Sequence, residues 1–172
     1  TIGAKMKVLI TYYSHSSNTK KLAEFIAKII KDEFQNAKID FFNAEPEKAY
    51  SKNYNAVLDE AKRDIKNNHK PKLKNSIEGI ESYDVIFIGS PNWWNTMAPP
   101  VNSFINSFDL SNKIIMPFCT HGGGGAGNIK RDIEKESKSK QTAKILSVYG
   151  SSASRSENEI RKWIKDIFIK TK

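Results

Sequence analysis

A short run of hydroxyl and amide side chains near the N-terminus has the composition of an anion site. The run, Ser14-His15-Ser16-Ser17-Asn18-Thr19, lies between an apolar segment at 8–13 and an amphipathic pattern that begins at Lys20. At a helix N-terminus, unpaired N–H groups and the helix dipole favour a negative charge. The run has no Lys or Arg and lacks the ending of a Walker loop, so it suits a terminal phosphate monoester held by neutral donors. Taken alone, it is more typical of an ordinary helix cap.

Two other loops follow apolar runs that are typical of buried strands, at 84–89 and 114–119. The first of these loops, at 90–100, is uncharged, and its tryptophans, Trp93 and Trp94, offer a wall to a flat apolar ligand. The alternative is that one tryptophan only fills the edge of the sheet. The other loop, at 120–127, contains five glycines in eight residues, which suits either close approach of its backbone N–H groups to a ligand or a flexible turn.

These loops need elements that bring them to one place. Apolar runs predict five strands, and apolar residues at helical spacing predict three helices. The strands are expected at 8–13, 38–42, 84–89, 114–119 and 143–149, and the helices at 20–34, around 57–65 and around 160–168. Ser156 and Glu159 have the spacing of a capping box, whereas Pro117 predicts a strand end or a bulge. The alternation predicts a doubly wound α/β fold, a parallel sheet with helices on both faces and ligands at the carboxyl ends of its strands.

The length of 172 residues suits a single domain. We interpret residues 1–5, which precede Met6, as a leftover of cloning and expect residues 6–172 to form that domain. No apolar run is long enough to span a bilayer, so no membrane association is expected. Cys119 is the single cysteine and is interpreted as an inert buried thiol, which favours a cytoplasmic protein.

The charge of the chain is strongly basic, with 28 Lys and Arg against 19 Asp and Glu. The excess is spread along both halves of the chain. Its densest cluster, at 130–144, is interleaved with carboxylates as on an ordinary solvated helix face. Because no aromatic platform or recognition motif accompanies the charge, we expect no nucleic-acid partner.

The three loops together resemble those of the flavodoxin family. The resemblance lies with short bacterial flavodoxins, which combine a Ser-x-Ser/Thr-Gly-Asn-Thr loop with a Pro-x-Trp-Trp loop and a Thr-His-Gly-Gly loop. It extends from Met6 to about Phe168 and includes, in order, the runs at 83–91 and 117–123. It implies a flavodoxin-like five-stranded parallel sheet of strand order 2-1-3-4-5, with FMN as the cofactor.

The resemblance assigns the FMN phosphate to the first loop, chiefly through hydroxyls and main-chain amides, and the isoalloxazine ring to the other two. The implied cofactor-binding residues are Ser14, His15, Ser16, Ser17, Asn18, Thr19, Pro91, Asn92, Trp93, Trp94, Asn95, Thr120, His121, Gly122 and Gly123. Ser17 and Asn95 stand where the family commonly has glycine, and a positive φ at Ser17 would cost about 1 kcal/mol. We expect no catalytic side chain and no metal.

The family implies an electron-transfer protein that shuttles electrons between partner proteins, a reductase and an acceptor, as a monomer or weak dimer. The basic charge departs from familiar acidic flavodoxins, so we expect partner surfaces of a different sign. Two alternatives stay open. One is an NAD(P)H-dependent quinone or nitro-compound reductase that uses FMN, with His121 as a proton or hydrogen-bond donor. The other is a flavin-free module that binds anions through the first loop.

Overall fold

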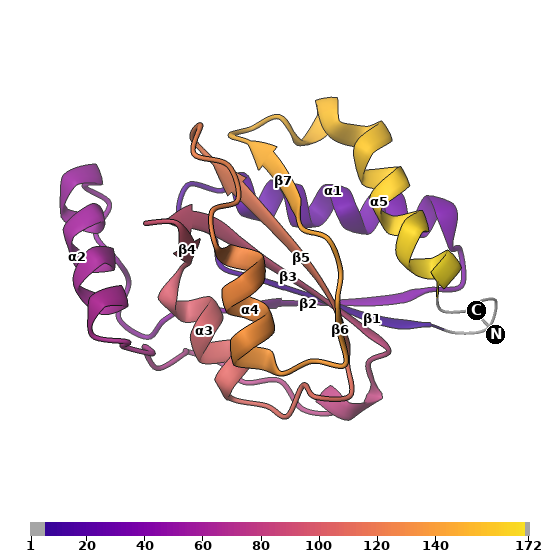
Figure 1. The fold of residues 1–172 in the computed structure, drawn as a ribbon, viewed down its shortest axis with the longest axis horizontal. Coiled ribbons are helices and arrows are strands. Elements are labelled where there is room, and N and C mark those ends of the chain that lie inside the picture. Colours follow the sequence, from indigo (N-terminus) through magenta and orange to yellow (C-terminus); the bar gives the residue numbers. More distant parts are fainter. Residues whose placement is uncertain (1–5, 171–172) are drawn as a thin grey trace.

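The computed structural model describes residues 6–170, and their side chains as far as Asp166. A central sheet is covered by helices on both faces (Figure 1). The strands are β1 (Lys7–Tyr12), β2 (Lys38–Asn43), β3 (Val85–Trp93), β4 (Thr96–Met97), β5 (Ile114–His121), β6 (Gln141–Thr142) and β7 (Leu146–Tyr149). The α-helices are α1 (Asn18–Glu33), α2 (Tyr54–Lys66), α3 (Pro99–Asn106), α4 (Ile129–Ser137) and α5 (Glu157–Lys170), with short 3₁₀ turns η1 (Ile80–Ser82) and η2 (Ala153–Ser156). The expectation for residues 1–5 lies outside the described part.

The strands follow the order β2-β1-β3-β5, with β6 and β7 beside β5 at the far edge. All of these neighbours are parallel, and only the two-residue β4 runs antiparallel, next to β3. This is the predicted order 2-1-3-4-5, in which β5 is the fourth predicted strand and β6 with β7 replaces the fifth. The predicted fold class is therefore confirmed.

The strand predicted at 143–149 is interrupted between β6 and β7, and Pro117 in the neighbouring β5 explains the position of this interruption. Ala143 donates its N–H to the carbonyl of Ile115 at 2.9 Å, so alternate residues of β5 direct their backbone groups toward this edge. Pro117 is the next residue of that set and has no N–H to donate. β5 continues through it in register with Ile88, so the expected strand end or bulge in β5 is wrong. The interruption falls in the neighbouring strand, between β6 and β7.

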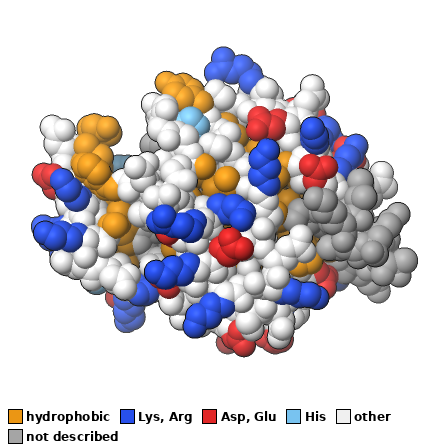
Figure 2. Space-filling model, in the orientation of Figure 1, with side chains coloured by type: hydrophobic (Ala, Val, Ile, Leu, Met, Phe, Trp, Pro, Cys, Tyr) orange, Lys and Arg blue, Asp and Glu red, His pale blue; other side chains and the backbone are white. Residues whose placement is uncertain are grey.

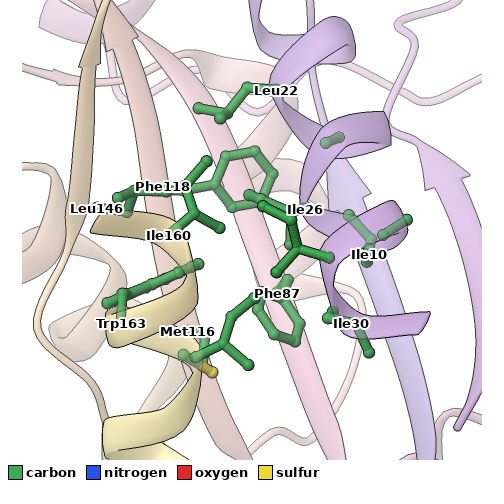
Figure 3. Close-up of a cluster of buried hydrophobic side chains, with 14 of the residues drawn as sticks. Ile10, Leu22, Ile26, Ile30, Phe87, Met116, Phe118, Leu146, Ile160 and Trp163 are labelled. Atoms are coloured by element: carbon green, nitrogen blue, oxygen red, sulfur yellow. The ribbon is translucent and has the colours of Figure 1, made fainter. Parts of the chain in front are cut away.

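Two apolar layers hold the helices against the sheet. Because side chains alternate along a strand, successive residues of β1 and β3 supply opposite faces. One cluster lies under α1 and α5 and includes Ile10, Phe87 and Trp163 (Figure 3). The other lies under α3 and α4 and includes Leu9 and Phe104. The sheet is thus buried on both sides, as the continuous apolar runs predict.

Three helical features differ from the sequence analysis or extend it. Helices α3 and α4 were not among the predicted helices, and prolines occupy the first turn of α3, where no N–H is needed. Ser156 donates its hydroxyl to the carbonyl of Ser152 at 3.0 Å, and no described hydrogen bond joins it to Glu159, so the predicted capping box is wrong. The apolar face predicted for the last helix continues at Ile167 and Phe168, whose side chains lie outside the described part. Of the helices described, none is both long and apolar enough to cross a membrane.

Gly89 provides a test of this packing. A Cβ at this position would lie 2.1 Å from Cε2 of Phe118, which is fully buried. We expect Gly89→Ala to lower the free energy of unfolding by about 1–3 kcal/mol, measured by urea denaturation. Phe118→Leu added to that variant makes room for the methyl group, so the double variant should lose less than the sum of the two single changes. A Gly89→Ala protein as stable as the wild type would contradict the packing described.

Candidate functional site

Three loops far apart in the sequence line one cleft at the carboxyl edge of the sheet. The cleft has a volume of about 320 Å³, and apolar side chains stand on both of its sides (Figure 2). The predicted residues that line it are His15, Ser16, Asn18, Pro91, Asn92, Trp93, Trp94, Thr120, His121 and Gly122. The other predicted residues, Ser14, Ser17, Thr19, Asn95 and Gly123, belong to the same loops but do not line the cleft. None of the lining residues is Lys, Arg, Asp or Glu.

The first loop leaves its backbone donors open. Helix α1 begins at Asn18, and Ser17 before it has a φ of 69° and makes no side-chain capping bond. The hydroxyl of Ser14 accepts a hydrogen bond from the N–H of Lys20 at 3.2 Å. Within the described part of the chain, the backbone N–H groups of residues 15–19 donate to no protein atom. The loop is therefore not an ordinary Ser/Asn cap, and its donors are free to bind an anion.

A buried hydrogen bond joins the first loop to the third. Oγ1 of Thr19, in the first turn of α1, lies 2.8 Å from Oγ1 of Thr120 near the end of β5. Both residues are buried. Because each hydroxyl would otherwise lose its partner away from water, this contact holds the start of α1 against the end of β5.

His15 ties the first loop to the segment before α2. Its Nε2 lies 2.8 Å from the carbonyl oxygen of Ser51, which can only accept, so Nε2 carries the proton and donates. Its ring also meets the ring of Trp93 edge to face, with centroids 5.8 Å apart. The loop is thus braced against two other segments.

Trp93 belongs to an aromatic cluster. Besides His15, its ring makes T-shaped contacts with Tyr13 and Tyr50, at centroid distances of 5.4 and 5.1 Å. Burial raises the pKa of both tyrosines well above the ordinary value, and for Tyr50 a hydrogen bond to Asp64 adds to the effect. Tyr13 and Tyr50 therefore stay uncharged over the physiological range. Of the two tryptophans, Trp93 is the one that fills the edge of the sheet.

Trp94 lies in the open, at the tip of a hairpin. Its side chain is 47% exposed, its Nε1 donates to the carbonyl of Leu58 in α2 at 3.0 Å, and Nζ of Lys62 lies 5.0 Å from its ring centroid. Trp94 and Asn95 form the two-residue turn between β3 and β4 with φ values of 53° and 65°. Two positive φ values are typical of a type I′ turn, which Asn tolerates better than Trp.

The glycine loop packs against this hairpin. The carbonyl of Asn95 accepts a hydrogen bond from the N–H of Asn128 at 2.7 Å, and Nδ2 of Asn92 donates to the carbonyl of Gly125 at 2.7 Å. A Cβ at Gly127 would lie 2.8 Å from the oxygen of Asn95, so this glycine is required by packing. The glycines at 122 and 123 meet nothing within 4 Å of a Cβ position and leave the backbone open.

His121 has a defined tautomer when neutral. Its Nδ1 accepts a hydrogen bond from the N–H of Gly123 at 3.0 Å, which leaves the proton on Nε2. Its ring packs edge to face against Tyr149, with centroids 5.8 Å apart. The residue can therefore donate one hydrogen bond without a change of charge.

Helix α2 forms a wall that the sequence analysis missed. Tyr54, Val57, Leu58 and Ala61 all line the cleft, as does Gly150 after β7. The apolar spacing at 57–65 predicted a helix there but assigned its apolar face to no site. Only Val57 and Ala61 of that face are buried, and no periodicity distinguishes a face against the core from one beside a cleft.

Comparisons with known proteins agree with the observed fold. A family model described as flavodoxin matches residues 7–167, and no curated protein matches the sequence. A solved structure of a candidate flavoprotein from Bacteroides eggerthii DSM 20697 is 26% identical with a TM-score of 0.75, and the match covers 94% of this chain and 97% of that one. A flavoprotein in complex with FMN from Lactobacillus acidophilus NCFM is 23% identical with a TM-score of 0.66 and coverage of 92% and 99%. Oxidised flavodoxin 2 from Bacillus cereus is 16% identical with a TM-score of 0.61 and coverage of 96% and 99%.

The bond between Thr19 and Thr120 can be tested by a double-mutant cycle. Thr19→Val and Thr120→Val each leave one buried hydroxyl without its partner, so each should lower the free energy of unfolding by about 1–3 kcal/mol. The double variant removes both hydroxyls and should cost less than the sum, with a coupling energy of about 1 kcal/mol from thermal or urea unfolding. Additive losses would contradict a direct contact between the two side chains.

Proposed function

The chain belongs to the flavodoxin family, and on that premise we propose that it binds FMN and transfers electrons between redox partner proteins. One observation carries the proposal: three loops separated in sequence line one cleft whose walls bear no Lys, Arg, Asp or Glu. FMN supplies the redox chemistry when bound. The protein then has to supply binding, orientation and local electrostatics.

The first loop would hold the phosphate. Its backbone N–H groups at 15–19 are free donors at the start of α1, where the helix dipole favours an anion. Ser16 and Asn18, whose side chains line the cleft, add a hydroxyl and an amide group. His15 braces the loop through its bond to Ser51. The donor set is neutral, which fits a phosphate monoester held by many hydrogen bonds.

The other two loops would hold the isoalloxazine ring. On one side, the hairpin offers Pro91, Asn92 and above all Trp94, because Trp93 is engaged in the aromatic cluster. On the other side, residues 120–123 offer open glycine backbone and the Nε2 proton of His121. The apolar wall of α2 would exclude water from the ring.

A second candidate function is an NAD(P)H-dependent reductase of quinones or nitro compounds. The tautomer of His121 favours it, because the Nε2–H beside the cleft is placed to donate a hydrogen bond to an oxygen of the quinone or nitro group as that group is reduced. Steady-state oxidation of NADPH by the FMN-loaded protein separates the two functions. We expect no turnover without an added reductase, and sustained turnover that falls with His121→Asn would favour the enzyme.

The absorption spectrum and a ligand comparison test the proposal itself. The purified protein, or the apoprotein after addition of FMN, should be yellow with flavin bands, and FMN should quench tryptophan fluorescence. Riboflavin lacks the phosphate and so gains nothing from the first loop, and we expect it to bind at least about tenfold more weakly. A colourless protein with no quenching would contradict FMN binding. Equal affinity for both ligands would contradict the role of the first loop.

Ser17→Gly tests whether the first loop is strained. Glycine adopts a positive φ without steric cost, so holding the loop in its binding shape should cost about 1 kcal/mol less, and FMN should bind about fivefold tighter by fluorescence titration. Ser16→Gly is the matched control, because Ser16 has no positive φ and its replacement only removes a hydroxyl. Unchanged or weaker FMN binding by Ser17→Gly would contradict the strain.

A further inference from the structure

The carboxylates of this chain avoid the edge where the cleft opens. The segments that follow β1, β3, β5 and β7, at 13–23, 94–108, 122–131 and 150–156, contain no Asp or Glu, although the chain has 19 in all. Carboxylates reach this region from other elements: Asp132 of α4 accepts from the hydroxyl of Thr96 at 2.6 Å, and helix α2 carries Glu60 and Asp64. Of these, Glu60 accepts from the N–H of Ser51 at 3.3 Å, and Asp64 accepts from the hydroxyl of Tyr50 at 2.8 Å.

Positive side chains remain at this edge without carboxylate partners. Lys20 and Lys21 are exposed in the first turn of α1, and Lys62 lies over the ring of Trp94. The guanidinium of Arg155, in η2, donates only to the hydroxyl of Ser152 among the described residues. Among the described residues, none of these four cations forms an ion pair, whereas Arg161 and Lys165 of α5 are paired with carboxylates of their neighbours. The cleft therefore opens on a positive surface.

Exposed aromatic rings stand at the same mouth. Four large apolar side chains are exposed in the described part of the chain, and three of them surround the cleft. Tyr54 and Trp94 line it, at 73% and 47% exposure, and Tyr149 packs on His121 at 60% exposure. Aromatic rings with few carboxylates are the composition of protein–protein contact surfaces.

We propose that this rim, formed by Tyr54, Trp94, Tyr149 and the four unpaired cations, docks an acidic partner protein that carries its carboxylates around its own redox centre. The proposal rests on the proposed function and names the kind of partner. Opposite charges would speed the encounter, and the aromatic rings would supply the short-range contact. A single-stranded nucleic acid fits less well, because it needs rings and cations in line along a groove, whereas these rings surround one opening.

The FMN-loaded protein and two probe proteins of opposite charge test the proposal. The probes are an acidic [2Fe–2S] ferredoxin and the basic cytochrome c, with binding measured by calorimetry between about 0.02 and 0.5 M salt. We expect ferredoxin to bind, with an affinity at least about tenfold lower at high salt than at low salt. We expect cytochrome c not to bind at either salt concentration. Tighter binding of cytochrome c, or ferredoxin binding that salt does not change, would overturn the proposal.

Charge-reversal variants locate the surface. The triple variant Lys20→Glu, Lys21→Glu and Lys62→Glu should bind ferredoxin at least about tenfold more weakly. Lys28→Glu, Lys140→Glu and Lys162→Glu together make the same change in net charge at exposed positions outside the rim and should stay within about twofold of the wild type. An equal loss of ferredoxin affinity in both triple variants would contradict the assignment of the docking surface to this rim. If a triple variant does not fold, the single variant Lys62→Glu tests the same surface, because Lys62 lies over the ring of Trp94 at the rim.

Two readouts keep this proposal separate from FMN binding. Flavin absorption together with no ferredoxin binding would overturn the docking surface alone. Absence of FMN uptake would overturn the proposed function, and the calorimetry would still report on the surface. Displacement of ferredoxin by an equal concentration of oligo-dT would overturn the proposal in favour of a nucleic acid.

Discussion

The parallel pairing of β3 with β1 on one side and β5 on the other is the constraint on which the cleft depends. Val85 of β3 pairs with Val8 and with Ile114, so the three strands start together and run in one direction. Their carboxyl ends consequently meet at one edge, where loops distant in sequence become neighbours. The buried bond between Thr19 and Thr120 then fixes the start of α1 against the end of β5.

Much of this arrangement could be predicted from the sequence, because strands and helices leave clear patterns of apolar residues in short segments. Continuous apolar runs mark strands buried on both faces, and the alternation with helices determines the edge at which the loops gather. The conformation of the first loop was also accessible. The family resemblance drew attention to position 17, because related loops have glycine there and glycine tolerates a positive φ. Ser17 of this chain has a φ of 69°. The assignment of individual residues to FMN stays a prediction.

The rest depends on contacts that no local pattern records. Trp93 and Trp94 are adjacent and chemically identical, yet one joins Tyr13 and Tyr50 in a cluster and the other lies exposed against α2. The difference arises because Trp93 is the last residue of β3, whereas Trp94 and Asn95 form the turn that follows it. Likewise, the apolar face of α2 has the same spacing whether it meets the core or a cleft. Because Pro117 has no N–H to donate, it interrupts the neighbouring strand between β6 and β7, whereas its own strand, β5, continues.

FMN bound at these three loops would contact one connected set of backbone amides, and an NMR titration of ¹⁵N-labelled apoprotein with FMN measures those contacts directly. The amide signals of residues 15–19 should shift most, together with those of the hairpin after β3 and of the glycine loop after β5. Amides at the opposite end of the strands should stay in place. Shifts confined to another part of the surface, or no shifts at saturating FMN, would contradict the claim that these three loops form one mononucleotide site.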